Sequence, residues 1–480
     1  MDTSISARLA ARDLAVVWHP CTQMHDHETL PMLPIARAEG AWLHGHDGRR
    51  YLDAVSSWWT CLLGHRHPPI VAALKDQLDR LDHVMLAGFT HTPAIELAEE
   101  LVRIAPKSAF SPPAQRGEMP GGQRGAAAGA DGHVLKRVFY ADNGSSAIEV
   151  ALKLSFHYWK NRQSGQGPAR TRFIALTGGY HGETLGALSV TDVPLYRNTY
   201  APLLLEPIFA PSPDAFEREP GESAAACAQR RLGELRAILE RHAHETCAVI
   251  VEPLVQCAGG MRMYDPGYLT GLRTLCDAFG VHLIADEIAV GFGRTGSLFA
   301  CEQAGIAPDF LCLSKGLTGG TLPLSAVLTT TDVYDAFYAD YSSGKAFLHS
   351  HSYTGNPLAC RAALATLQVL RDEPVLERNR ALAAHLAAKL APLADHPHVA
   401  DVRQTGMIAA VELVRDRRTR EPFPAAERRG LRVYRHGLER GAVLRPLGNV
   451  VYFMPPYCIT PDEIDFMVEV AREGIDVAVA

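Results

Sequence analysis

The sequence lacks the features that mark membrane, secreted and metal-binding proteins. No apolar run approaches the roughly 20 residues of a membrane span, and the polar start, residues 1–11, lacks the apolar core of a signal peptide. The ten cysteines include no C-x-x-C pair and the 21 histidines no H-x-x-x-H pair. We therefore expect no metal site and no disulfide framework, but a cytoplasmic protein in which Cys257, Cys276 and Cys312 are buried, reduced thiols.

The net charge and the absence of nucleotide-binding motifs exclude further classes of protein. The net charge is −6, so we expect neither a nucleic acid nor an anionic membrane as partner. The chain has no G-x-G-x-x-G run after a first strand and no G-K-[ST] loop, which argues against a nicotinamide dehydrogenase and a P-loop enzyme. With 480 residues and no internal repeat, the chain has room for one large and one smaller domain.

Strand-like apolar runs alternate with helix-like stretches through the middle of the chain. The expected strands are 138–140, 173–176, 247–251, 281–285, 310–313 and 325–328. This alternation predicts an α/β domain with a mostly parallel sheet covered on both faces. We expect that large domain to span 66–355, with an N-terminal arm and a hairpin in 1–65 and a smaller α+β domain in 356–480. Residues 111–133 are rich in Gly, Ala and Pro, which suits a flexible surface insertion.

Two of these runs end on charged side chains that suit one kind of chemistry. The run 281–285 leads into Asp286, and the run 310–313 leads into Lys315. A pyridoxal phosphate enzyme needs a lysine that bonds to the cofactor and an acid that keeps the pyridine nitrogen protonated. Either run alone also fits a core strand that ends in solvated charges.

Two glycine-rich turns follow strands and suit a phosphorylated ring. In the run 139–149, Gly144 and the Ser145 hydroxyl open a helix whose N-terminus can bind phosphate. The run 178–184 contains Tyr180, which can stack on a planar heteroaromatic ring. A plain N-capped helix and an ordinary surface turn also explain the two runs when each is taken alone.

Three other side chains are candidates for the site. Glu252 ends another strand and is expected at the same sheet edge as Asp286 and Lys315, although a structural ion pair explains it as well. Trp58 could form an apolar wall for a substrate, or pack in the core. Arg445 could clamp a carboxylate through its planar fork, or lie on the surface.

Taken together, these motifs resemble the class III aminotransferases of the fold-type I pyridoxal phosphate enzymes, and among them a branch of the biotin pathway. The resemblance covers about residues 18–456. The family-wide motifs are Asp286-Glu287 with 291–296, Ser314-Lys315-Gly316 and 355–360. The motifs of the branch are 18–20, 56–59, 142–145, 179–182, 259–264 and 454–457.

The resemblance implies a role for each matching residue and no metal. Lys315 would bind the cofactor and move the proton, Asp286 would pair with the pyridine nitrogen, and Tyr180 would stack on the ring. The implied cofactor-binding residues are Gly144, Ser145, Tyr180, Asp286, Lys315 and Ser352. The implied substrate-binding residues are Trp58, Lys315, Ser350, Arg445 and Tyr452. Because Ser352 would reach the phosphate of the other subunit, an obligate homodimer is expected.

The resemblance also implies a reaction, a ping-pong transamination that turns 8-amino-7-oxononanoate into 7,8-diaminononanoate. Arg445 would bind the carboxylate of that oxo acid. The usual amino donor is S-adenosylmethionine, but Cys21 and His351 depart from the common pattern where the donor would lie. The run 351–356 resembles a branch that can use lysine as donor.

Two other readings stay open. An ω-amino acid or polyamine aminotransferase would share the cofactor motifs, and the paired Trp58-Trp59 argues against it. A catalytically idle relative that works as a binding protein would have no use for Lys315 and Asp286, both of which are intact.

Overall fold

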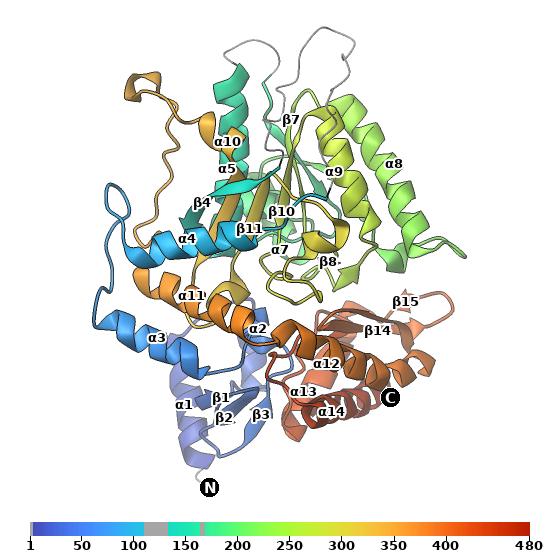
Figure 1. Ribbon diagram of the computed structural model, residues 1–480. Helices are drawn as coiled ribbons and strands as arrows, with labels where there is room; N and C mark the ends of the chain where they lie inside the picture. The colour runs from blue at the N-terminus through green and yellow to red at the C-terminus, as the bar shows by residue number, and fades with distance from the viewer. Residues whose placement is uncertain (1–2, 110–132, 164–168) are drawn as a thin grey trace. The chain divides into compact units, whose positions relative to one another are not determined.

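A seven-stranded sheet forms the centre of the larger part of the chain (Figure 1). The structure is a computed structural model and describes residues 3–109, 133–163 and 169–480. The strand order is β4-β12-β11-β10-β7-β5-β6, with β12 antiparallel to both neighbours and the other adjacent pairs parallel. The strands are β4 (Leu135–Ala141), β5 (Arg172–Leu176), β6 (Ile208–Ala210), β7 (Thr246–Val251), β10 (His282–Asp286), β11 (Phe310–Leu313) and β12 (Ser325–Thr330). The predicted α/β fold with a mostly parallel sheet is confirmed.

The central strands are buried along their whole length because helices cover the sheet. Every residue of β7, β10 and β11 is buried, as expected of parallel strands packed on both faces. On one face, Ile148 and Ala151 of α5 (Gly144–Gln163) share a core with Ile284 and Val327 of the sheet. The helices α8 (Ala224–His242) and α9 (Gly267–Phe279) pack side by side (Figure 1).

Shorter elements complete this part of the chain. Its other helices are α3 (Pro68–Leu78), α4 (Thr92–Ile104), α6 (Leu185–Ser189), α7 (Pro194–Arg197), α10 (Thr331–Asp335) and α11 (Pro357–Asp372). Single 3-10 turns are η2 (Asn198–Leu203), η3 (Ala215–Glu217), η4 (Ala300–Ala304), η5 (Lys315–Thr318) and η6 (Tyr341–Ser343), and β8 (Val255–Gln256) pairs with β9 (Arg262–Met263).

A second, smaller part contains the expected hairpin and two helices that pack together. β2 (Trp42–Gly45) pairs antiparallel with β1 (Ile35–Glu39) and with β3 (Arg50–Leu52). α13 (Arg429–Arg440) packs on α14 (Pro461–Val479). The remaining elements of this part are α1 (Thr3–Val16), η1 (Met24–Glu28), α2 (Ser56–Trp59), η7 (Ala391–Asp395), β15 (Glu421–Pro422), η8 (Ala425–Glu427) and β16 (Val450–Phe453). The strands β13 (Val399–Thr405) and β14 (Ile408–Asp416) each belong only in part to it.

Contacts divide the chain into two compact units whose bounds differ from the expected domains. The larger unit is Pro69–Ala383 with Arg403–Ala410, and the smaller is Met1–Pro68, Ala384–Val402 and Val411–Ala480. The first boundary lies near the expected 65/66, but the expected boundary after 355 comes too early. The reason is that α11 packs on α4 and η5 of the larger unit, and the second boundary falls within α12 (Val375–Leu390).

The apolar run 442–444 is not a strand but makes an isolated bridge from Ala442 to Leu52. Pro446, which has no N–H, follows soon after. The expected insertion 111–133 lies outside the described residues except for His133. Within the described ranges, no helix is both long and apolar enough to cross a bilayer.

Candidate active site

Asp286 lies at the carboxyl end of one parallel strand, and Lys315 lies just beyond the carboxyl end of its neighbour. Asp286 is the last residue of β10 and lies opposite Cys312 of β11, and Lys315 begins the turn that follows β11. Burial lowers the pKa of the Lys315 amine, while the nearby charge of Asp286 opposes that shift. The structure thus brings together the acid and the lysine that the sequence singled out.

The Asp286 carboxylate is held by two hydrogen-bond donors. His181 Nδ1 lies 2.8 Å from Asp286 Oδ2, and the backbone N–H of Ile288 donates to Oδ1 at 3.1 Å. His181 is itself buried, and its backbone N–H donates to the Thr191 hydroxyl at 2.9 Å. These two contacts fix the orientation of the carboxylate.

Glu252 lies just beyond β7, the strand next to β10, as the sequence predicted. Its two carboxylate oxygens accept the backbone N–H groups of Tyr180 and Cys257, both at 2.9 Å. Burial raises the pKa of Glu252 to about 7, His181 opposes the shift and the charge of Asp286 adds to it. Glu252 therefore joins two loops at this sheet edge and carries a proton more readily than an exposed glutamate does.

The two glycine-rich turns contact each other at the start of α5. The helix begins at Gly144, and the Ser145 hydroxyl accepts the backbone N–H of Glu183 at 2.8 Å. A Cβ at Gly182 would come within 2.0 Å of Ser145 Oγ, so only glycine permits this approach. The arrangement leaves a small-residue turn at the N-terminus of a long helix, which is a favourable place for a phosphate.

Tyr180 lies in the loop that joins these groups. Its hydroxyl donates to Glu183 Oε1 at 2.9 Å, and its ring centroid lies 5.2 Å from that of Tyr196. The residue is half-buried.

The segment with Ser350 and Ser352 is tied to the phosphate-binding turn by the histidine between them. His351 Nδ1 lies 2.9 Å from Asp142 Oδ2, two residues before Gly144. Both serines are exposed, and neither hydroxyl makes a hydrogen bond within the described part of this single chain. Their expected roles need a partner or a substrate and remain predictions.

The remaining predicted substrate-binding residues belong to the smaller unit. Arg445 Cζ lies 4.6 Å from the ring centroid of Trp58, a cation–π contact that places the guanidinium over the indole face. Tyr452 is buried, and its hydroxyl accepts the indole N–H of Trp59 at 3.1 Å. Tyr452 therefore supports Trp59, the residue next to Trp58.

Sequence reasoning missed the partner of Asp286. His181 belongs to the run 178–184 that was singled out for Tyr180, but it had no assigned role. Its position directly after a ring-stacking candidate and its place in a loop at the sheet edge were the available signals.

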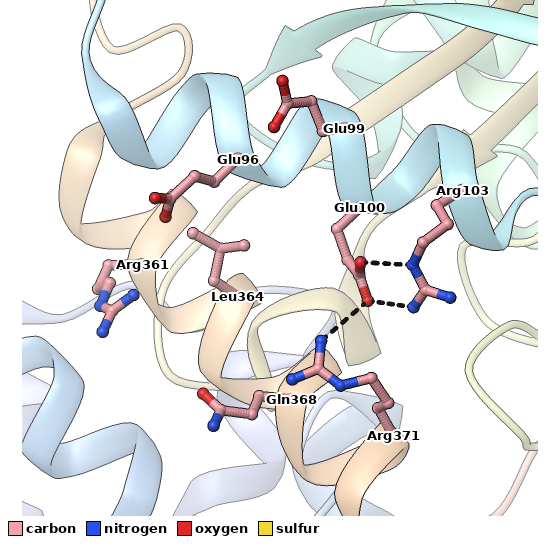
Figure 2. Close-up of a pocket in the computed structure, with 8 residues that line it drawn as sticks. All are labelled: Glu96, Glu99, Glu100, Arg103, Arg361, Leu364, Gln368 and Arg371. Carbon is pink, nitrogen blue, oxygen red and sulfur yellow. Dashed lines mark hydrogen bonds and ion pairs between the residues drawn. The ribbon is translucent and has the colours of Figure 1, made fainter.

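A hollow on the larger unit contains none of the predicted site residues. In Figure 2, Glu100 of α4 forms ion pairs with Arg103 and with Arg371 of α11. The nitrogen–oxygen distances of these pairs are 2.6 and 3.6 Å. The residues that line it are Glu96, Glu99, Glu100, Arg103, Arg361, Leu364, Gln368 and Arg371. Its three acidic and three basic side chains give it no net charge.

Comparison with known proteins identifies the family. The family model for Aminotransferase class-III matches residues 23–473. The chain belongs to the class-III aminotransferases. It is 46% identical, over 98% of this chain and 82% of the relative, to the adenosylmethionine-8-amino-7-oxononanoate aminotransferase of Nitratidesulfovibrio vulgaris.

Solved structures agree with this placement of the aminotransferase. The crystal structure of adenosylmethionine-8-amino-7-oxononanoate aminotransferase from Methanocaldococcus jannaschii is 37% identical, with a TM-score of 0.87 over 98% of this chain and 99% of that one. The omega transaminase from Pseudomonas jessenii in complex with PMP is 28% identical, with a TM-score of 0.87 over 98% of each chain.

Class-III aminotransferases use pyridoxal phosphate, and the residues of the larger unit fit this cofactor. Lys315 supplies an amine whose lowered pKa increases its uncharged, nucleophilic fraction. Asp286 supplies a carboxylate that two donors hold in place, as a protonated pyridine nitrogen requires. The turn at Gly144 and Ser145 supplies helix N–H groups for the phosphate.

Proposed function

We propose that this aminotransferase converts 8-amino-7-oxononanoate into 7,8-diaminononanoate for biotin biosynthesis, with S-adenosylmethionine as amino donor. The pairing of Lys315 with Asp286 at neighbouring strand ends supports the transamination. The substrate is inferred from relatives named for it, including one 44% identical over 95% of both chains, from Helicobacter pylori.

Within this proposal, residues of the larger unit handle the proton. The bound cofactor supplies an electron sink for the charge that develops on the donor carbon. Lys315 Nζ removes the proton from that carbon and later returns it, which its lowered pKa favours. Asp286, oriented by His181, keeps the pyridine nitrogen protonated. Tyr180 stacks on the ring, and Gly144 with Ser145 binds the phosphate.

Residues of the smaller unit bind the acid end of the substrate. Arg445 makes a bidentate contact with the carboxylate, for which its planar fork is suited. Trp58 covers one face of the guanidinium and offers apolar surface to the substrate chain. Tyr452 supports this wall through Trp59.

We further propose a homodimer in the cytoplasm. In that dimer the partner subunit's Ser352 completes the phosphate site, which its exposure in a single chain would allow. Exposed Tyr341, Leu348 and Tyr353 on the same segment are apolar surface that a second copy would cover. A reducing cytoplasm suits the buried free thiols of Cys257, Cys276 and Cys312.

Two alternatives have specific support. The run 351–356 favours lysine as donor in place of S-adenosylmethionine. In that alternative, Ser350 and His351 lie beside the bound donor. The similarity to the Pseudomonas jessenii omega transaminase favours an ω-amino acid or polyamine substrate.

Separate half-reactions test these possibilities. The enzyme loaded with pyridoxal phosphate is mixed with S-adenosylmethionine or with L-lysine, and the visible absorbance of the cofactor is followed. We expect one donor to bleach the absorbance and 8-amino-7-oxononanoate to restore it. If neither donor acts while an ω-amino acid does, the omega-transaminase alternative replaces the proposal. If no amine acts on a loaded protein, the idle-relative reading replaces both.

A further inference from the structure

Four consecutive non-glycine residues of the smaller unit have left-handed backbone conformations. The φ angle is 49° at Ser56, 45° at Ser57, 69° at Trp58 and 74° at Trp59. L-residues visit this region singly and not in runs, because Cβ comes too close to the following carbonyl oxygen. Such strain persists only where the surroundings over-determine it, and it gathers at functional sites. We call residues 56–59 the left-handed turn.

A buried carboxylate holds the middle of the left-handed turn. The Ser57 hydroxyl donates to Asp53 Oδ2 at 2.7 Å. His65 Nε2 lies 3.0 Å from the same oxygen, and the side chain of Asp53 is only 1% exposed. A hydrogen bond to a buried charge is stronger than one between neutral groups, so this contact opposes relaxation of the backbone at Ser57.

Two more contacts fix the ends of the left-handed turn. The Ser56 hydroxyl donates to the carbonyl oxygen of Met454 at 2.6 Å, and the Trp59 indole N–H donates to the Tyr452 hydroxyl at 3.1 Å. Met454 in turn donates its backbone N–H to the carbonyl oxygen of Ala54 at 2.9 Å. Both ends of the turn are therefore attached to β16 and to the residue that follows it.

The left-handed turn presents Trp58 to Arg445. Trp58 is 38% exposed although its neighbour Trp59 is buried, and its ring lies 4.6 Å from the Arg445 guanidinium carbon. No acidic side chain pairs with Arg445 anywhere in the described ranges. A guanidinium with one face on an indole keeps its N–H edge available, which is the edge that binds a carboxylate in two places.

We propose that Asp53 and Ser57 are positioning residues for carboxylate recognition by Arg445. They keep the turn left-handed, the turn sets the plane of the Trp58 ring, and the ring orients the guanidinium. If residue 57 relaxed to negative φ, the following peptide would rotate and carry the indole away from Arg445. The inference rests on the proposed function, in which Arg445 binds the carboxylate of the oxo acid.

Two substitutions of the same serine separate backbone conformation from the hydroxyl itself. Ser57→Ala removes the hydrogen bond but keeps the Cβ that disfavours positive φ. Ser57→Gly removes both the hydrogen bond and that Cβ. For Ser57→Ala we expect the KM for 8-amino-7-oxononanoate to rise about 10-fold with kcat within about two-fold. The reason is that the carboxylate contact binds the substrate and the transition state equally, so its loss weakens binding without slowing the reaction. For Ser57→Gly we expect a KM within about three-fold of wild type and an equal or higher Tm.

Hexanoate serves as a probe that does not depend on the proposed substrate. It carries the carboxylate and an apolar chain, and its inhibition constant can be measured against any amine that the holoenzyme accepts. We expect the constant to rise about 10-fold in Ser57→Ala and to change little in Ser57→Gly, in parallel with the KM values.

The outcomes separate the two proposals. Equal hexanoate constants in wild type and Ser57→Ala, or an equal rise in both variants, would overturn the positioning role. A hexanoate pattern as expected, in an enzyme that does not aminate 8-amino-7-oxononanoate, would retain the positioning role and refute the proposed substrate.

Discussion

The Nδ1 atom of His181 lies 2.8 Å from the Oδ2 atom of Asp286, and both side chains are buried in the larger unit. The histidine thus contacts one oxygen of the carboxylate that we propose pairs with the pyridine nitrogen. The backbone N–H of Ile288 donates to the other oxygen. These two contacts set the orientation of Asp286.

Substitution of this histidine tests the role of that contact. A hydrogen bond to a charged group contributes about 1.5–3 kcal/mol, so we expect His181→Phe to lower kcat about 10- to 100-fold while leaving the protein folded. The measurement is kcat as a function of pH together with the near-visible spectrum of the bound cofactor. His385→Phe removes a histidine from a partly exposed pair with Asp465 and is the matched control. Equal effects of the two substitutions would contradict the assignment.

Lys315→Ala should abolish turnover. Removal of a nucleophile that also moves the proton costs more than about 1,000-fold in many enzymes, and we expect a loss of at least that size in both half-reactions. Lys75→Ala, which changes an exposed lysine of α3, should leave the rate within about two-fold. Steady-state turnover near the wild-type rate in Lys315→Ala would refute the mechanism.

Glu252 should make stability depend on pH in a defined window. Burial raises its pKa from 4.5 to about 7, so between these values the folded chain keeps a proton that the unfolded chain has released. Stability therefore falls as pH rises from about 4.5 to about 7, by up to about 1.4 kcal/mol per pH unit. We expect Glu252→Gln to flatten the dependence of Tm on pH across this window, measured on the holoenzyme.

The control for this prediction is Glu240→Gln, on the exposed side of α8. Its curve of Tm against pH should run parallel to that of the wild type. A Glu252→Gln curve that is also parallel to the wild type would show that Glu252 does not titrate in this range.

His133 should also make stability fall as pH rises, but at higher pH than Glu252 does. Burial alone would lower its pKa, but hydrogen bonds to Asp277 and Asp309 outweigh burial and raise the pKa to about 9. The stability that the charged imidazole contributes is complete below about pH 6.5 and is lost as pH rises through about 9.

We therefore expect the difference in urea-unfolding free energy between wild type and His133→Asn to shrink between pH 6 and pH 9.5. His157→Asn, on the partly exposed side of α5, is the control. A difference that stays constant over this interval would contradict the raised pKa.

The sequence by itself determined the sheet and its reactive edge. Short runs rich in apolar residues, such as 281–285 and 310–313, indicated buried strands, and strands of a parallel sheet end at a common edge. Asp286 and Lys315 were therefore expected together before the fold was known, and the turn at Gly144 and Ser145 was recognisable from its small residues.

Only the tertiary structure decided the contacts between residues distant in sequence and the strained backbone. His181 meets Asp286 across 105 positions of the chain, and no local pattern specifies such a pair. The left-handed turn is formed by Ser-Ser-Trp-Trp, which contains none of the glycine or asparagine that normally signals positive φ. The chain adopts it because hydrogen bonds to Asp53, to Tyr452 of β16 and to Met454 offset the local strain. Likewise, packing of α11 on α4, and not a change in composition, sets the boundary between the units.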